Sequence, residues 1–199
     1  MSDSDFSRVR RRLVLATGAG LCSTLVKRAD AEEKTGTPEA RLRELLSERR
    51  SLRLFRGTEH VEATYWTVDG GYNRDEYLNV CWLMRDLQAD RVFPMNRGLL
   101  DVLCGVQAWL LRTGVTAPLR IHSGYRTPKT NRQTEGAALD SRHLVGRAVD
   151  ISVAGVSNLK LAGMASVLGR GGTGFYPGRN FVHVDTGDER IWVDRPRKS

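Results

Sequence analysis

The stretch Ser141-Arg142-His143-Leu144-Val145-Gly146-Arg147-Ala148-Val149-Asp150 carries an imidazole and a carboxylate that are seven residues apart. The apolar run that contains Asp150 predicts a strand over residues 148–153. Gly146 lacks a β-carbon and therefore allows the backbone to turn sharply into that strand. We expect this turn to bring the side chains of His143 and Asp150 toward one another.

A second stretch, Phe181-Val182-His183-Val184-Asp185, alternates in a way that predicts another strand. Side chains two residues apart on a strand lie on the same face, so His183 and Asp185 share one. Two neutral imidazoles and one carboxylate are a common ligand set for catalytic zinc, with water in the fourth position. Histidine 143, Asp150 and His183 are therefore candidate ligands, although the spacing alone also fits residues with a purely structural role. The chain contains no HExxH motif.

Further short elements are expected around these two stretches. We predict a strand over 119–123 and an antiparallel meander of three strands over 172–176, 181–185 and 190–193. A helix over 158–168 begins after Ser157, which is suited to cap it. The polar, Gly/Ala-rich residues 131–139 predict an exposed loop.

The first half of the chain indicates a hairpin between helices. Thr37 followed by Pro38 predicts a helix start, and apolar spacing continues that helix to about Arg50. Residues 52–54 and 61–66 predict the two strands of a hairpin. Two more helices are expected, one from the cap Asn73 to Leu87 and one over 98–112. The whole pattern predicts an α+β fold with helices packed on a mostly antiparallel sheet.

Length and charge narrow the classes of function. The 199 residues, 40% of them hydrophobic, are enough for one domain with a buried core. A formal charge of +8 favours an anionic partner. Six of the 31 basic and three of the 23 acidic residues precede residue 32, however, which leaves a charge of +5 for residues 32–199. That mildly basic balance removes the main support for a nucleic-acid binder.

Residues 1–31 predict an export signal. Arg11-Arg12-Leu13-Val14-Leu15 is similar to a twin-arginine signal, and the apolar stretch over 13–26 is too short and too rich in small residues to span a bilayer. Ala29-Asp30-Ala31 supplies a cleavage site. The alternative is a basic, alanine-rich tail without a targeting role. Export predicts a location in the periplasm or cell envelope, with no stable membrane span after removal of the signal, and it conflicts with a nucleic-acid partner.

The sequence leaves the redox state of the two remaining cysteines open. Cys81 and Cys104 remain once the signal that contains Cys22 is removed, and each lies in a predicted apolar helix. They are either two buried free thiols or one disulfide, because their separation in space does not follow from the sequence.

Several motifs now occur in a fixed order along the chain. They are Ser123-Gly124-Tyr125-Arg126-Thr127-Pro128, Ser141-x-His143-x-x-Gly146-x-Ala148-x-Asp150, Gly171-Gly172-x-Gly174-x-Tyr176-Pro177, Phe181-Val182-His183-Val184-Asp185-x-Gly187 and Arg190-x-Trp192. Together they resemble the murein endopeptidase K family, within the larger zinc group of D-alanyl-D-alanine carboxypeptidases, vancomycin-resistance dipeptidases and the Hedgehog signalling domain. The resemblance covers residues 51–194 and implies a zinc peptidase domain there. The expected organisation is completed by the export signal at 1–31, a linker and helix at 32–50 and a basic tail at 195–199.

The resemblance also implies site roles. The family's zinc ligands fall on His143, Asp150 and His183, and family members cut the peptide stems of peptidoglycan. Arg126 would lie near the metal and either bind a substrate carboxylate or stabilise the oxyanion. Its alternative role is an ion pair with a local acid.

This chain differs from the wider group in the residue that would act as general base. The dipeptidases use a glutamate a few residues before the last histidine ligand, whereas residues 151–182 of this chain contain no Asp or Glu. Asp185 is the best substitute, because it shares a face with His183 and could take a proton from the metal-bound water. It could equally orient a ligand histidine from behind. His122 is a weaker candidate for the base.

The sequence as a whole predicts an exported, monomeric zinc endopeptidase that hydrolyses the peptide cross-links of peptidoglycan by metal-activated water. Two alternatives stay open. One is a D,D-carboxypeptidase of the same fold, and the other is a cell-wall-binding module that holds zinc without turnover.

Overall fold

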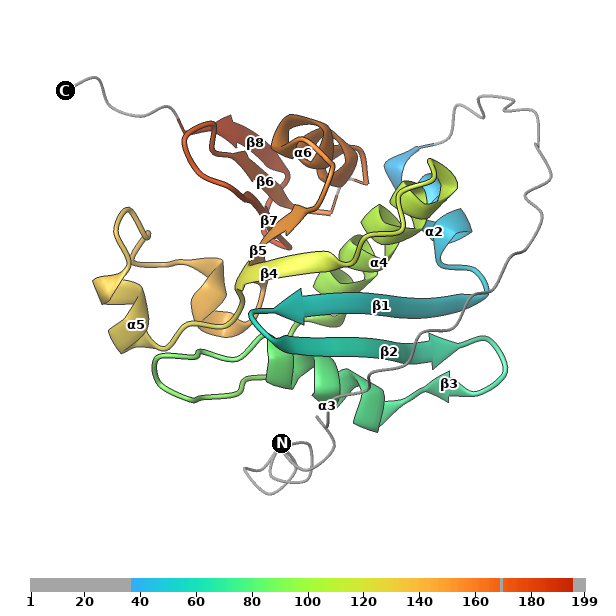
Figure 1. Cartoon of the computed structure of the whole chain (residues 1–199), viewed down its shortest axis with the longest axis horizontal. Coiled ribbons are helices and arrows are strands. Elements are labelled where there is room, and N and C mark those ends of the chain that lie inside the picture. Colours follow the sequence, from blue (N-terminus) through green and yellow to red (C-terminus); the bar gives the residue numbers. More distant parts are fainter. Residues whose placement is uncertain (1–36, 169, 195–199) are drawn as a thin grey trace.

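A mixed sheet of eight strands forms the centre of the computed structural model, which describes residues 37–168 and 170–194 (Figure 1). The strand order is β3-β2-β1-β4-β5-β7-β6-β8, and every neighbouring pair is antiparallel except β1–β4 and β6–β8. The expected α+β fold is therefore confirmed. The strands are β1 (Arg49–Arg56), β2 (Glu59–Thr67), β3 (Gly71–Tyr72), β4 (Leu119–Ser123), β5 (Ala148–Val153), β6 (Gly172–Phe175), β7 (Val182–Asp185) and β8 (Arg190–Val193).

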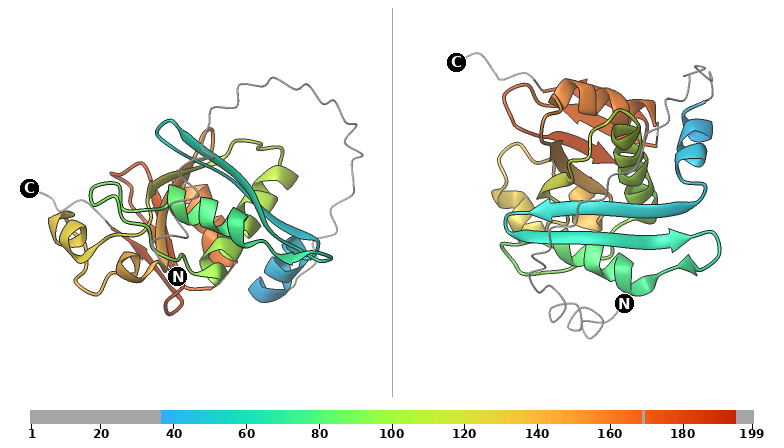
Figure 2. Two further views of the ribbon diagram at one scale, coloured as in Figure 1. Left: turned by 90° about the horizontal axis from the view of Figure 1, so that it is seen from below. Right: turned by 45° about the vertical axis from the view of Figure 1, so that its right-hand side comes forward.

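Three helices cover one face of this sheet. Helix α3 packs on β1 and β2, α4 on β1, and α6 on β5, β6 and β7; Figure 2 shows this layer from two further directions. The helices are α2 (Pro38–Leu45), α3 (Arg74–Leu83), α4 (Arg97–Arg112), α5 (Pro128–Gln133) and α6 (Asn158–Val167), with a 3-10 turn η2 (Arg142–Val145). None of the helices in the described residues combines the length and apolarity needed to cross a bilayer.

The core follows the period-two pattern of the central strands. Val149, Ile151, Val182 and Val184 are buried beneath the helices. Because side chains alternate along a strand, Asp150 and His183 must lie on the opposite face of the sheet. The helices thus stabilise one face and leave the other to the polar residues singled out in the sequence.

The predicted hairpin and helix caps are confirmed. Strands β1 and β2 pair in antiparallel register, with Leu54 opposite Val61. The Asn73 side chain accepts a hydrogen bond from the backbone N–H of Glu76, and Ser157 accepts one from Lys160. These bonds satisfy N–H groups that have no partner within the first turn of a helix.

Two predicted helices end earlier than expected. Helix α2 ends at Leu45, because the chain from Arg49 onward pairs with β2. Helix α3 ends at Leu83 rather than Leu87, which is 49% exposed. The cause lies at Asp86, whose carboxylate accepts the backbone N–H groups of Gln88 and Ala89. A side chain that bonds the local backbone in this way competes with helical hydrogen bonding.

The segment expected to be a loop over 131–139 begins inside a helix. Helix α5 runs through Gln133, and the Thr127 hydroxyl caps it by accepting the N–H of Thr130. The sequence signal was Thr127 followed by Pro128, the same start signal that identified α2.

The predicted meander is wrong in its strand order. β6 and β7 pair antiparallel as expected, but β8 pairs in parallel with β6 rather than with β7. The second edge of β7 is already taken by β5. Strand β8 can therefore join only at the free edge of β6.

The two cysteines of the described region are free thiols. Cys81 lies in α3 and Cys104 in α4, and both are buried. Burial raises the pKa of each thiol to about 11, so both are protonated at neutral pH. Of the two alternatives left open by the sequence, the structure supports the pair of buried thiols.

The loop between α3 and α4 supports both segments that carry site residues. Gly146 has a φ of 63°, and a β-carbon there would lie 2.5 Å from the Pro94 carbonyl oxygen. Its own carbonyl oxygen accepts the N–H of Asn96 at 2.8 Å. A β-carbon on Gly124 would overlap the Met84 carbonyl oxygen in the same way. These close backbone contacts require glycine.

We predict that Gly146→Ala lowers the free energy of unfolding more than Gly155→Ala does. Both glycines have positive φ, but a β-carbon on Gly155 would meet no atom within 4 Å. Left-handed backbone strain alone predicts a loss of about 1–2 kcal/mol at Gly155. The overlap at Gly146 should add about 1–3 kcal/mol. Urea unfolding of the two variants measures the difference, and equal losses would show that the contact with Pro94 is unimportant.

Candidate metal centre

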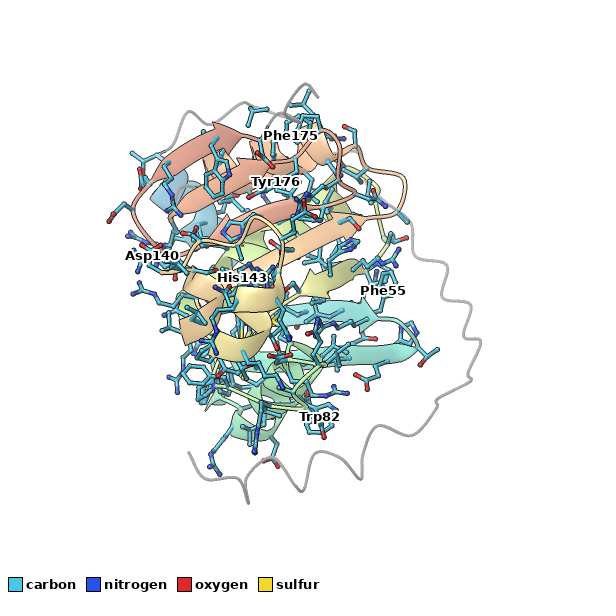
Figure 3. The ribbon with its side chains drawn as sticks, turned by 90° about the vertical axis from the view of Figure 1, so that its left-hand side faces the viewer. Phe55, Trp82, Asp140, His143, Phe175 and Tyr176 are labelled. Carbon is cyan, nitrogen blue, oxygen red and sulfur yellow. The ribbon has the colours of Figure 1, made fainter. Side chains whose placement is uncertain are left out.

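Three elements bring His143, Asp150 and His183 together on the open face of the sheet. His143 comes from η2, Asp150 from β5 and His183 from β7, where Asp150 and His183 are direct cross-strand partners. The ligand atoms of all three residues lie within 4.8 Å of one another. Figure 3 looks onto this face, with His143 at its centre and Tyr176 above it. Residues 40 positions apart in the chain thus form one group.

Each imidazole already uses the nitrogen that points away from the group. Nδ1 of His143 lies 2.6 Å from the Gly124 carbonyl oxygen, and Nε2 of His183 lies 3.0 Å from Oδ2 of Asp185. A carbonyl oxygen and a carboxylate only accept, so these two nitrogens carry the protons. In the neutral rings Nε2 of His143 and Nδ1 of His183 then hold lone pairs that face Asp150.

The resulting cluster of acceptors has the size of a tetrahedral zinc site. Nε2 of His143 lies 3.3 Å from Nδ1 of His183, and these nitrogens lie 3.4 and 3.0 Å from Oδ1 of Asp150. Tetrahedral zinc with bonds of about 2.0–2.1 Å separates its ligands by about 3.3 Å. Three lone pairs at such distances repel one another unless a cation or a proton lies among them. The residues present therefore fit a divalent cation.

The electrostatics of the group agree with a cation site. Burial alone would raise the pKa of Asp150, but the neighbouring imidazoles His143 and His183 hold it well below its ordinary value. Burial would lower the pKa of His183, yet its hydrogen bonds to Asp150 and Asp185 raise it. A proton therefore occupies Nδ1 of His183 readily when no metal is bound, and a cation must displace it.

Asp185 lies behind His183 in a cradle of donors. Its carboxylate accepts the N–H groups of Gly172 at 3.0 Å and Gly187 at 2.8 Å, and the Arg190 guanidinium at 2.7 Å. Burial would raise the pKa of Asp185, but these donors and His183 hold it well below its ordinary value. The imidazole ring separates the carboxylate from the three ligand atoms. This geometry favours the orienting role considered for Asp185 over that of proton acceptor.

Arg126 is tied to the same group from the other side. Its Nη2 donates to Oδ2 of Asp150 at 2.6 Å, and its Nε donates to the Ser123 hydroxyl at 2.8 Å. The structure thus shows the ion pair with a local acid that the sequence left open as its alternative role. This pair directs the second oxygen, Oδ1, toward the histidines.

His122 is not part of the group. Its Nε2 lies 2.7 Å from the Ser152 hydroxyl, and its ring packs against Phe181 with centroids 5.9 Å apart. Burial lowers the pKa of His122, with a further contribution from Arg120. His122 is therefore a half-buried neutral imidazole on β4, the strand that pairs with the Asp150 strand β5.

Three groups that support the candidate ligands do not follow from the sequence. They are the Gly124 carbonyl, the Gly172 N–H and the Arg190 side chain. Backbone groups carry no residue-type signal, so the first two could not be found. Arg190 belongs to a motif noted in the sequence, but its partner is clear only once β8 lies beside β6.

A cleft of about 1310 Å³ opens over the three candidate ligands. One wall is formed by the segment 134–142, and the other by residues of the β6–β8 region, with Tyr176 and Trp192 among them. Nε1 of Trp192 donates to the Tyr176 hydroxyl at 3.2 Å, which fixes the two rings in an edge-on arrangement. The three candidate ligands thus lie at the floor of a cleft with room for a large molecule.

Comparisons with known proteins give a consistent family. The family model described as "Peptidoglycan L,D-endopeptidase MepK" matches residues 45–192. A protein of Escherichia coli K12 named "Peptidoglycan L,D-endopeptidase MepK" is 32% identical over 187 residues, which is 92% of this chain and 96% of that protein. A Haemophilus influenzae protein named "Probable peptidoglycan L,D-endopeptidase MepK" is 40% identical over 116 residues, which is 56% of this chain and 61% of that protein.

We predict that Asp185→Asn weakens zinc binding by about 10–100-fold, while Asp150→Asn weakens it further. An amide has one oxygen and one NH2 group, so the NH2 group must face either the N–H groups of Gly172 and Gly187 or the donor Nε2 of His183. In both orientations a donor meets a donor, and the support of His183 is weakened. Asp188→Asn is the matched control, since Asp188 is an exposed acid that lines the same cleft. Competition titration with a chromophoric chelator gives the affinities, and circular dichroism verifies the fold. An Asp185→Asn affinity equal to that of the control would contradict the orienting role.

Proposed function

The chain belongs to the peptidoglycan L,D-endopeptidase MepK family, and from that premise we propose that it is a zinc-dependent endopeptidase of peptidoglycan cross-links. One observation supports zinc above all others. The lone-pair nitrogens of His143 and His183 and one oxygen of Asp150 converge at distances of 3.0–3.4 Å, while the other nitrogen of each ring is already bonded.

A zinc ion at this site would act as a Lewis acid and lower the pKa of water to about 7. The protein's part is to hold the donors in place. Gly124 fixes the tautomer of His143, and Asp185 fixes that of His183, with Arg190 and two backbone N–H groups holding Asp185 in turn. Such outer contacts keep ligand atoms oriented and raise their basicity.

We assign Arg126 two roles, which are to hold Asp150 in place and to stabilise the oxyanion. Its Nη2 and Nε hold Asp150 and Ser123, and it lines the cleft. Nη1 has no hydrogen bond to any residue that the structure describes, so it is the donor left to stabilise a developing oxyanion. Asp185 is assigned to orientation, and no glutamate takes the place of the dipeptidase base between Asp150 and His183.

The proposed substrate is the peptide stem of peptidoglycan. The names of the relatives specify an L,D-bond in that polymer. The cleft over the ligands is large, and both charged and aromatic side chains line it, as a branched, charged peptide requires. We propose a location in the periplasm or cell envelope, since a peptidoglycan hydrolase must reach the wall. The twin-arginine signal that supports it lies at residues 1–31, outside the described residues, as does the basic tail at 195–199.

The central test is digestion of purified sacculi by the mature protein. We expect loss of cross-linked muropeptide dimers, abolition of that loss by a chelator and its recovery when zinc is added back. His183→Ala should reduce cleavage at least about 1000-fold, because a three-ligand site that loses one imidazole no longer holds the metal in an active geometry.

Fragment analysis separates the alternatives in the same experiment. Loss of the terminal alanine alone would instead support a D,D-carboxypeptidase. Binding to sacculi without any cleavage would support a wall-binding module. A folded His183→Ala protein that digests sacculi as well as wild type would overturn the metal mechanism.

A second test concerns export. We predict that Arg11→Lys with Arg12→Lys retains the protein in the cytoplasm, because the twin-arginine pathway recognises the arginine pair rather than positive charge alone. Arg8→Lys is the control and should leave export unchanged. Fractionation of cells that produce each variant gives the distribution. Normal export of the double variant would contradict the twin-arginine route.

A further inference from the structure

Four arginines line the cleft, but they are not equivalent. Two of them form ion pairs with the buried acids of the metal centre. Arg126 donates to Asp150 at 2.6 Å, and Arg190 donates to Asp185 at 2.7 Å. Their charge is already balanced by those carboxylates, and their guanidinium groups are held by them. Neither guanidinium is therefore free to pair with a carboxylate of a ligand, and Arg126 keeps only Nη1 for the reacting carbonyl oxygen.

The remaining two arginines, Arg142 and Arg179, have no such partner. Throughout residues 37–168 and 170–194, no acidic side chain forms an ion pair with either of them. Four exposed acids also line the cleft, and each of them stands outside ion-pair distance of both guanidinium groups. Those acids are Glu135, Asp140, Asp188 and Asp194.

Arg142 and Arg179 approach the cleft from opposite walls. Arg142 precedes the ligand His143 in η2, and its Nε lies 3.0 Å from where a β-carbon on Gly187 would be. Its guanidinium therefore lies over the β7–β8 turn. Arg179 follows β6 in the chain, and its Nη2 lies 3.8 Å from where a β-carbon on Gly136 would be. Each side chain reaches across to the wall opposite its own backbone.

The backbone that carries Arg179 is held in place. Its N–H donates to the Tyr176 carbonyl oxygen at 3.0 Å, and its own carbonyl oxygen accepts Nδ2 of Asn158 at 3.3 Å. The guanidinium also lies 5.9 Å from the centroid of the Tyr176 ring, within reach of a cation–π contact. Arg142 is half-buried in η2. Both charges are thus presented from ordered segments on the two sides of His143.

An L,D cross-link between two diaminopimelate residues carries a carboxyl group on each side of the scissile bond. On the carbonyl side it lies at the D-centre of the residue that supplies the carbonyl. The carbon that bears the scissile nitrogen also bears a carboxyl group, and in a cross-link to the D-centre of diaminopimelate this group is outside the peptide chain. It is a carboxylate when free and neutral when amidated. A guanidinium binds a carboxylate through two parallel charge-assisted hydrogen bonds, and a neutral amide cannot accept in that way.

We propose that Arg142 and Arg179 bind free carboxylates of the stem peptides on either side of the scissile bond, so that the protein selects stems with unmodified diaminopimelate carboxyl groups over amidated ones. This inference rests on the proposed function and names the substrate class of that site. Binding energy from groups remote from the reacting carbonyl positions the substrate over the metal ligands.

The test compares a diaminopimelate cross-linked muropeptide dimer with the same dimer amidated at those carboxyl groups. Wild type should cleave the free-acid dimer with at least about a tenfold higher kcat/KM. Arg142→Gln and Arg179→Gln should each lower kcat/KM on the free-acid dimer by about tenfold or more and change that on the amidated dimer less than about twofold. Arg132→Gln, which removes one charge from an exposed position on α5 outside the cleft, should leave both values unchanged.

A binding measurement separates failure of this inference from failure of the proposed function. Uncross-linked stem peptides, free or amidated, have no cross-link to cut and report affinity alone by calorimetry. Both glutamine variants should bind the free-acid peptide about tenfold more weakly than wild type does, and the amidated peptide with almost unchanged affinity. Their zinc content and thermal unfolding should equal those of wild type. Discrimination in binding without cleavage would overturn the enzyme and keep the carboxylate site. Equal effects on both peptides, or no effect, would overturn the carboxylate site whatever the turnover. Arg142→Lys keeps the charge without the paired donors and should give an intermediate loss.

Discussion

Repulsion among three acceptor atoms governs the centre of this molecule. Nε2 of His143, Nδ1 of His183 and Oδ1 of Asp150 lie 3.0–3.4 Å apart in a buried position, where their lone pairs are poorly screened. A protein tolerates such a cluster only if its scaffold imposes it and a cation or proton balances it. The β5–β7 register imposes half of it by making Asp150 and His183 cross-strand partners.

Two chains of contacts keep the ligands oriented. One runs from His183 to Asp185 and on to Arg190 and the N–H groups of Gly172 and Gly187. The other runs from Asp150 to Arg126 and Ser123. Both end at residues in strands or immediately beside them. The donors are thus fixed by the sheet rather than by mobile side chains, which lowers the reorganisation needed when a cation binds.

The same arrangement divides the arginines of the cleft into two classes. Arg126 and Arg190 balance the buried acids of the candidate metal centre. The two arginines on the walls form no ion pair with an acid of the described residues. The mild overall charge of the chain conceals this local difference. The proposed recognition of an anionic substrate depends on the placement of these two guanidinium groups and little on net charge.

The sequence by itself determined the α+β class, the hairpin, the helix caps, the family resemblance and the three candidate ligands. Local signals carry these features: Asn73 and Ser157 cap wherever they precede a helix, and alternation puts His183 and Asp185 on one face of any strand. The position of β8 beside β6, the end of α3 at Leu83 and the placing of Asp185 behind His183 were decided by tertiary structure. Each of these three features depends on contacts with residues that are distant in the chain. Such contacts are set by packing, which no local sequence pattern encodes.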